Sequence, residues 1–115
     1  MHNSHDVRGV AVLSLALLLA PPIHAEQQDA EGHYAMGSVA LMEGQLDQAL
    51  EHLNQAIALN PRHVEAYYKR GLVYSQTDHP REAVEDFDKA LAMSPRMAKA
   101  YTARAFAREA LGDLD

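Results

Sequence analysis

Histidine is the residue type in this chain best suited to bind a metal ion or to move a proton near neutral pH. The 115 residues include seven histidines. Three of them lie in the first 24 residues, and the other four are His33, His52, His63 and His79. No two of these four are spaced i, i+4, the spacing that places two metal ligands on one helix face. We therefore expect surface or helix-capping roles for them, and no metal site.

Catalytic patterns are also missing from the sequence. The chain has no cysteine, which excludes a thiol nucleophile, a thiolate zinc site and disulfide bonds. It contains no glycine-rich phosphate loop and no HExxH motif, and its serines have no accompanying base at a recognisable spacing. Asp78 and His79 are expected to form a turn rather than a catalytic dyad. We therefore predict that the protein is not an enzyme and uses no cofactor.

The charge of the chain is acidic, with 16 Asp and Glu against 10 Lys and Arg and a formal net charge of -6. Phosphate backbones are bound through clustered Lys and Arg, so nucleic acid is not expected as a partner. A group of four carboxylates after Pro80 is expected to lie on a solvated convex face and to favour solubility. These residues are Glu82, Glu85, Asp86 and Asp88.

The elements that carry these side chains repeat with a period of 34 residues. When the sequence is shifted by 34 residues against itself, glycine falls on glycine, alanine on alanine, a large apolar residue on another, and proline on proline. The matching pairs are Gly37 and Gly71, Ala49 and Ala83, Leu53 and Phe87, Ala56 and Ala90, and Pro61 and Pro95. Each unit holds two segments with apolar residues at helical spacing. The sequence therefore predicts a tandem array of helical hairpins.

Turn-forming residues predict where these helices begin and end. We expect helices at about residues 30–42 and 46–59, a second hairpin at about residues 64–93, and one further helix at about residues 97–111. The turns inside the hairpins fall at Gly44 and Asp78, which can adopt a left-handed backbone conformation. Pro61 and Pro95 follow the second helix of their units, because proline cannot continue a helix.

This pattern resembles that of the tetratricopeptide repeat family. The family's first-helix motif, Trp-x-x-Leu-Gly-x-x-Tyr, falls on Tyr67, Arg70, Gly71 and Tyr74, and its second-helix motif falls on Ala83, Phe87, Ala90 and Pro95. The resemblance implies an all-α fold, an α-α superhelix (solenoid) of helix-turn-helix repeats. It implies a repeat domain at residues 30–115, with repeats at 30–63 and 64–97, a partial repeat at 98–115, and a polar lead-in at 26–29 before it.

In this family, the first helices of successive repeats line a concave groove that holds a peptide or a partner helix. Carried over by helical spacing, the resemblance implies a groove made by Glu31, Tyr34, Ser38, Leu41, Glu65, Tyr68, Leu72, Ser75, Thr102, Phe106 and Glu109. Such side chains suit a partner that offers apolar groups and some positive charge. The alternative is that this stripe only packs against neighbouring helices. The stripe contains no Lys and no Asn, so we expect no carboxylate clamp of the chaperone-docking kind.

Residues 1–25 resemble a secretory signal peptide. Arg8 precedes an apolar run at residues 10–20, a Pro-Pro pair then ends any helix, and Ala25 is a suitable cleavage position. The run is about half the ~20 residues that span a bilayer, which disfavours a permanent transmembrane helix. We predict cleavage between Ala25 and Glu26 and export to a bacterial periplasm or out of the cell, without stable membrane insertion afterwards.

These features predict an exported protein-interaction module that binds a partner protein or peptide and has no chemistry of its own. Two alternatives remain open. The chain is the N-terminal part of a longer exported repeat protein whose binding surface lies beyond residue 115, or it is a membrane-tethered adaptor that keeps its N-terminal segment. Because solenoids need about three repeats to bury a stable core, this one is expected to require a partner, self-association or further repeats.

Overall fold

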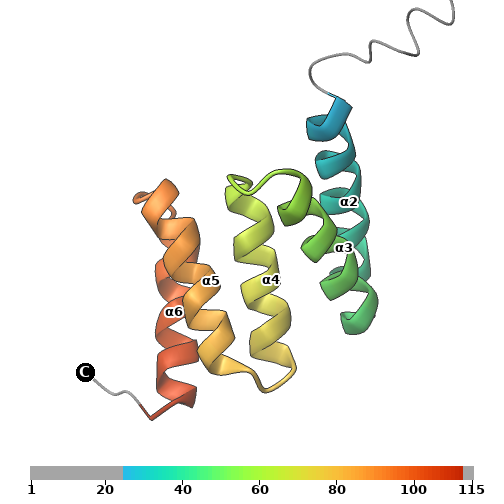
Figure 1. The fold of residues 1–115 in the computed structure, drawn as a ribbon. Coiled ribbons are helices and arrows are strands. Elements are labelled where there is room, and N and C mark those ends of the chain that lie inside the picture. Colours follow the sequence, from blue (N-terminus) through green and yellow to red (C-terminus); the bar gives the residue numbers. More distant parts are fainter. Residues whose placement is uncertain (1–24, 113–115) are drawn as a thin grey trace, which may run out of the picture.

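The computed structural model of this protein describes residues 25–112 and shows five helices joined by short turns. The helices are α2 (Ala25–Met42), α3 (Leu46–Leu59), α4 (Val64–Gln76), α5 (Pro80–Met93) and α6 (Ala98–Ala110). They lie side by side as successive hairpins (Figure 1). No strand occurs between residues 25 and 112, and no helix in that range is long and apolar enough to cross a membrane. The predicted all-α fold of helical hairpins is confirmed.

The predicted helix boundaries agree with the structure to within one residue, except at the N-terminus. There, α2 begins five residues before the expected start at Ala30, so the polar lead-in at residues 26–29 is helical. The sequence AEQQDAE favours a helix and contains no Gly or Pro to stop one. The predicted signal peptide, residues 1–25, lies outside the described residues except for Ala25, and the last three residues of the predicted partial repeat lie outside them as well.

The two turns inside the hairpins use left-handed backbone conformations, as predicted. Gly44 follows α2 with a φ of 76°, and Asp78 takes the equivalent place after α4 with a φ of 61°. Pro80 starts α5, where its missing N–H leaves no hydrogen bond unmade. Between repeats, Asn60 and Ser94 end α3 and α5 with non-helical backbone conformations, at φ of -139° and -137°. These residues precede the prolines that were expected to stop the helices.

Each hairpin depends on a glycine that lets its two helices approach closely. A Cβ atom on Gly37 of α2 would lie 2.8 Å from Cγ of Leu53 on α3. One on Gly71 of α4 would lie 2.5 Å from Cε1 of Phe87 on α5. Both distances are much shorter than ordinary carbon–carbon contact, and Leu53 and Phe87 are fully buried. The repeating pair of glycine and large apolar residue is therefore a packing unit, as the sequence predicted.

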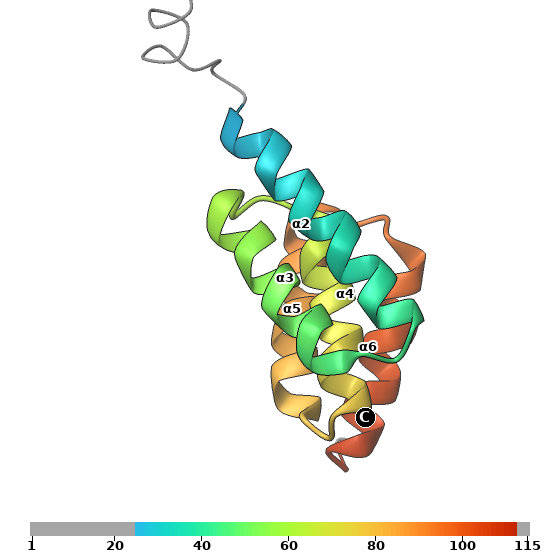
Figure 2. The same cartoon turned by 90° about the vertical axis from the view of Figure 1, so that its right-hand side faces the viewer.

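The hairpins join into one stack because α4 packs on both α3 and α5. One buried cluster joins α2, α3 and α4 and consists of Ala40, Ala49, Leu53, Ala56, Ala66 and Val73. The second joins α5 and α6 and consists of Ala83, Phe87 and Ala107. Most members are alanines, whose small side chains allow close helix packing. Figure 2 shows the resulting two layers, with the first helices α2, α4 and α6 on one side and the second helices α3 and α5 on the other.

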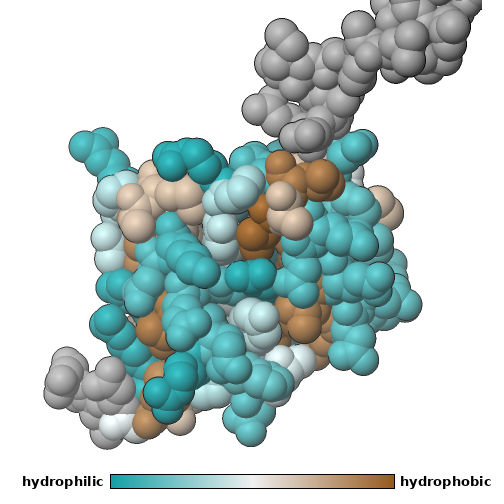
Figure 3. All heavy atoms as spheres, in the orientation of Figure 1, coloured by the Kyte–Doolittle hydropathy of each residue, from teal (hydrophilic) through white to brown (hydrophobic). Residues whose placement is uncertain are grey.

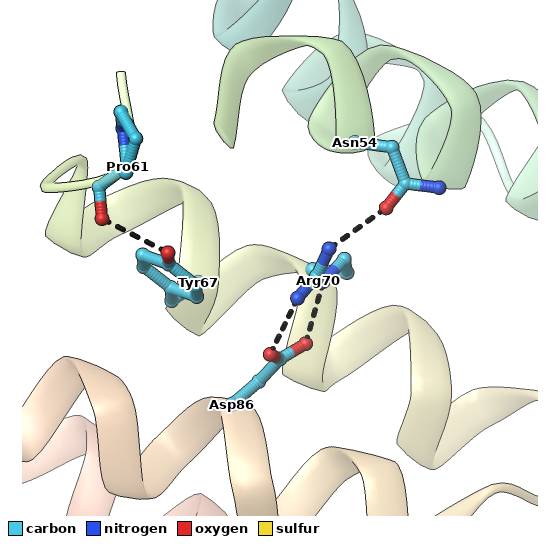
Figure 4. A network of polar contacts seen from close by, with 5 residues as sticks. All are labelled: Asn54, Pro61, Tyr67, Arg70 and Asp86. Atoms are coloured by element: carbon cyan, nitrogen blue, oxygen red, sulfur yellow. Dashed lines mark hydrogen bonds and ion pairs between the residues drawn. The ribbon is translucent and has the colours of Figure 1, made fainter. Parts of the chain in front are cut away.

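A buried ion pair connects α4 to α5 and, through an asparagine, to α3 (Figure 4). Nε and Nη2 of Arg70 donate to the two carboxylate oxygens of Asp86 at 2.7 and 2.8 Å, and Nη1 donates to Asn54 at 2.9 Å. The hydrogen bond to Asp86 raises the pKa of Arg70, although burial opposes this shift. Asp86 is 2% exposed. The expectation of a solvated Asp86 is wrong, because Asp86 turns toward α4, where the guanidinium group compensates for the lost water.

A second polar contact recurs with the period of the repeat. The hydroxyl of Tyr67 donates to the carbonyl oxygen of Pro61 at 2.9 Å (Figure 4). One repeat later, the hydroxyl of Tyr101 donates to the carbonyl oxygen of Pro95, also at 2.9 Å. Each bond ties the beginning of a first helix to the loop before it. The chain therefore enters α4 and α6 along the same path.

Candidate binding cleft between α4 and α6

An open cleft of about 430 Å³ lies between α4 and α6, the first helices of the second and third repeats. It is lined by Tyr68, Leu72 and Ser75 from α4 and by Lys99, Thr102, Ala103 and Phe106 from α6. Five of these belong to the groove predicted from the sequence, namely Tyr68, Leu72, Ser75, Thr102 and Phe106. Because α4 and α6 share one layer (Figure 2), equivalent positions of two repeats reach a common cleft. Glu109 is exposed on α6 outside this lining.

The cleft combines half-buried apolar side chains with an exposed aromatic one. Tyr68 and Leu72 are half-buried and pack against the core cluster of α5 and α6. The rings of Tyr68 and Phe87 lie 5.9 Å apart. Phe106 is 68% exposed, and covering it with a partner gains about 25 cal/mol for each Å² of apolar surface removed from water. The cleft thus combines two apolar side chains held by core packing, Tyr68 and Leu72, with the exposed Phe106, which is free to contact a ligand.

Lys99 adds a positive charge that the sequence analysis did not place in the groove. Its Nζ donates to Oε2 of Glu65 at 2.9 Å and lies 4.7 Å from the centre of the Tyr68 ring, which suits a cation–π contact. The hydrogen bond to Glu65 raises the pKa of Lys99, although desolvation opposes this shift. The stripe predicted from the sequence therefore omitted Lys99, which lines this cleft. The repeat could have indicated that Lys99 lies near Glu65, because Lys99 follows it by 34 residues, at the same position of the next repeat.

The predicted groove residues of the first repeat do not line this cleft. Tyr34 and Leu41 are half-buried and pack against the core cluster of α2, α3 and α4. The Oγ atom of Ser38 is buried and has no hydrogen-bond partner among residues 25–112. Oε1 of Glu31 lies 2.6 Å from Nε2 of His63, which begins the second repeat. In the first repeat, the stripe thus packs α2 against its neighbours.

The four histidines of the described region have different surroundings. Nδ1 of His63 accepts the N–H of Ala66 at 3.1 Å and caps α4, so its predicted capping role is confirmed. His79 is exposed just before α5. His33 and His52, 19 residues apart, meet across α2 and α3 with their Nδ1 atoms 3.2 Å apart. Spacing along a single helix could not reveal this pair. Within residues 25–112, no three His, Cys, Asp or Glu side chains converge.

The surface is mostly hydrophilic, with hydrophobic residues in separate patches (Figure 3). In the described part of the chain, the exposed large apolar side chains gather on the first and last helices. They are Met36, Val39 and Met42 on α2, and Tyr101, Phe106 and Leu111 on α6 or just after it. In a solenoid, the outer faces of the end helices are covered by a further repeat, a capping element or a partner.

The sequence matches a family model described as "Tetratricopeptide repeat" over residues 37–114. Among solved structures, "Crystal structure of MamA" is 36% identical, with a TM-score of 0.73, and the match covers 76% of this chain and 51% of that one. The Arabidopsis OM64 TPR domain is 26% identical, with a TM-score of 0.75 and coverage of 76% and 73%. The second TPR of Spaghetti (RPAP3), bound to the HSP90 peptide SRMEEVD, is 28% identical, with a TM-score of 0.75 and coverage of 80% and 87%.

These matches differ in how much of the other protein they include. The chain spans about half the length of two of the MamA structures, 51% and 48%, but most of the OM64 and RPAP3 domains. No curated protein sequence matches it. The family match at residues 37–114 includes the whole cleft between α4 and α6.

Proposed function

Because the chain belongs to the tetratricopeptide repeat family, whose domains are protein–protein interaction modules, we propose that it binds an extended segment of a partner protein in the cleft between α4 and α6. The observation that carries this proposal is the convergence on one cleft of five predicted residues, one of which is the exposed Phe106. Aromatic side chains in such a position are typical of binding hot spots. We expect Tyr68, Leu72 and Phe106 to make the main contacts.

Similar domains support a peptide as the ligand. The first and second TPR domains of RPAP3, 26% and 28% identical to this chain, are each described as bound to the HSP90 peptide SRMEEVD. An open cleft between two first helices suits an extended segment better than a folded domain, because the side chains of an extended segment can enter it one by one. Because these relatives are described by what they bind, we also propose that this chain has no catalytic activity of its own.

The charges near the cleft favour a different peptide from that acidic one. The protein carries a formal net charge of -6, which repels an acidic peptide at long range. Lys99 is already paired with Glu65 at 2.9 Å, so an acidic group would have to displace this carboxylate. We propose that the partner segment presents apolar side chains toward Phe106 and a Lys or Arg side chain toward Glu65 beside the cleft.

Selection from a displayed peptide library on the full-length protein tests this function. We expect selected peptides to combine apolar with basic residues, and their affinity to fall at least about tenfold in Tyr68→Ala and Phe106→Ala. Met42→Ala is the matched control, because Met42 is apolar and 84% exposed but lies on α2 outside the cleft. If the selected peptides bind both cleft variants as tightly as the unmodified protein, the proposed site is wrong.

We further propose that the protein is exported and acts outside the cytoplasm. The sequence of residues 1–25 supports this, with its apolar run and its small residue before the predicted cleavage point. Sequencing the N-terminus of the protein from separated cell fractions is the test. A mature chain that starts at Glu26 in the periplasm or medium is expected. A chain that retains Met1 in the membrane fraction indicates the tethered adaptor, and one that retains Met1 in the cytoplasm contradicts export.

A further inference from the structure

His33 on α2 and His52 on α3 form a contact that the peptide cleft does not use. Their Nδ1 atoms lie 3.2 Å apart, and both residues are half-buried. The ring centroids lie 5.5 Å apart. This separation exceeds the distance between the nitrogens by about twice the distance from an imidazole centre to its own nitrogen. The two Nδ1 atoms therefore lie on the facing edges of the rings, and their lone-pair directions point toward each other.

Two imidazole nitrogens at this distance can share a proton or a metal ion. When they share a proton, one Nδ1–H donates to the other Nδ1, so the two rings hold different tautomers. When both Nδ1 atoms are unprotonated, both can bind one ion. With nitrogens 3.2 Å apart and metal–nitrogen bonds of about 2.0 Å, such an ion lies about 1 Å to the side of the line between them, so both rings must turn to direct their lone pairs at it.

A third ligand can come from Met36, which lies one helical turn after His33. It follows His33 by three residues on α2, and side chains at i and i+3 share a helix face. Met36 and His52 line the same open cleft, of about 360 Å³. Met36 is 49% exposed, so its sulfur is accessible, and its flexible side chain can turn toward the two nitrogens.

We propose that His33, His52 and Met36 bind copper(I). Thioether sulfur is a soft ligand that selects copper(I), and imidazole also suits copper. Magnesium and calcium require oxygen ligands, and structural zinc sites use four protein ligands. Within residues 25–112, no third His, Cys, Asp or Glu joins the histidine pair, so these residues do not supply the four ligands of a structural zinc site. A site of two nitrogens and one sulfur therefore favours a soft monovalent ion over the common divalent ones.

Titration of the full chain with silver(I), a redox-stable ion of the same class, tests the site. We expect a rise in Tm of about 5 °C when free Ag⁺ is about ten times its Kd. Calorimetry should show that the unmodified protein binds one equivalent of Ag⁺. The affinity for Ag⁺ should fall at least about 100-fold in both His33→Ala and His52→Ala. Met36→Leu should weaken it about tenfold, and Zn²⁺ should bind at least about tenfold more weakly than Ag⁺. A chromogenic copper(I) chelator in anaerobic solution then measures copper(I) itself.

Matched variants separate this site from general effects of histidine and methionine. His79→Ala removes an exposed histidine elsewhere, and Met42→Leu removes an exposed methionine from the same helix, so neither should change the affinity for Ag⁺. His52→Gln keeps a polar side chain of similar size, so it remains informative if the alanine variant unfolds, and it should still lose the ion. Tyr68→Ala, which tests the peptide cleft, should bind Ag⁺ normally.

Three results would overturn the copper(I) site. One is Ag⁺ binding that survives unchanged in His52→Gln. Another is an equal loss of affinity in Met36→Leu and Met42→Leu, because this would mean that the thioether of Met36 is not a ligand. The third is Zn²⁺ binding tighter than Ag⁺, because the site would then select a divalent ion.

Discussion

Glu65 and Lys99 occupy the same position in successive repeats, 34 residues apart, and form an ion pair of 2.9 Å between α4 and α6. The residue at this position in the first repeat is Glu31, and two glutamates cannot form an ion pair with each other. Glu31 instead lies 2.6 Å from Nε2 of His63 at the start of α4. The change from glutamate to lysine at one repeat position thus places an ion pair beside the cleft between α4 and α6.

Replacing Glu65 by glutamine is expected to change which peptides the cleft binds. Lys99 then loses its carboxylate partner, and one negative charge beside the cleft disappears. Affinity for the acidic peptide SRMEEVD should rise about fivefold, which corresponds to roughly 1 kcal/mol. Fluorescence anisotropy of the labelled peptide measures this change. Glu109→Gln removes a like charge outside the cleft and should have little effect, so equal affinities in the two variants would show that Lys99 does not contact the ligand.

The same ion pair is expected to lose its stabilising effect at high pH. The hydrogen bond to Glu65 raises the pKa of Lys99 above the ordinary 10.5, so the folded state favours the protonated lysine. Its contribution to stability is therefore fully present below pH 10.5 and is lost as the pH rises through the raised pKa. Urea unfolding of the unmodified protein and of Lys99→Met, at several pH values, measures this. A stability difference that grows above pH 10.5 would contradict the sign of the shift.

Removing Asp86 should destabilise the protein much more than removing Asp88. Asp86→Ala leaves the Arg70 guanidinium without its partner, where the side chains of Arg70 and Asp86 are only 16% and 3% exposed, and should cost about 3 kcal/mol. Asp88 pairs with Arg104 at 2.7 Å but its side chain is 49% exposed, so Asp88→Ala should cost less than about 1 kcal/mol. Urea unfolding compares the two variants. Equal losses would mean that the Arg70 pair is not a buried one.

The two helical glycines Gly71 and Gly32 are expected to respond oppositely to alanine. The added Cβ at Gly71 would lie 2.5 Å from the buried Phe87 ring, so Gly71→Ala should destabilise by about 1–3 kcal/mol. At Gly32 nothing lies within 4 Å of the added Cβ, so Gly32→Ala should stabilise by up to about 1 kcal/mol through helix propensity. Thermal unfolding followed by circular dichroism measures both. A stabilising Gly71→Ala would show that the helices are not packed this closely.

We expect substitutions in the two hairpin turns to have opposite effects on stability. Asp78 has a φ of 61°, which glycine adopts without steric cost, so Asp78→Gly should stabilise by about 0.5–1 kcal/mol. Gly44 has a φ of 76°, so Gly44→Ala should destabilise by about 1 kcal/mol. The melting temperatures of the two variants are the measurement. If Asp78→Gly lowers the melting temperature, the aspartate side chain stabilises the turn by more than its backbone strain costs.

Most of the helical framework could be predicted from the sequence because its determinants are local. Apolar residues at helical spacing and the prolines at positions 61 and 95 act within a few residues of themselves, and α3, α4 and α5 begin and end where they indicated. The 34-residue repeat extends this prediction to packing, because equivalent residues meet equivalent neighbours. The contact of Gly71 with Phe87 and the five predicted residues of the cleft follow from this regularity.

The sequence by itself determined the repeat, its helices and its turns, whereas only the tertiary structure decided which side chains meet across helices. Asp86 lies in an acidic segment, yet the packing of α4 on α5 turns it toward Arg70. His33 and His52 are 19 residues apart, and their 3.2 Å contact depends on the distance and rotation between α2 and α3. Spacing along one helix contains neither quantity, because both are set by how whole helix surfaces pack together.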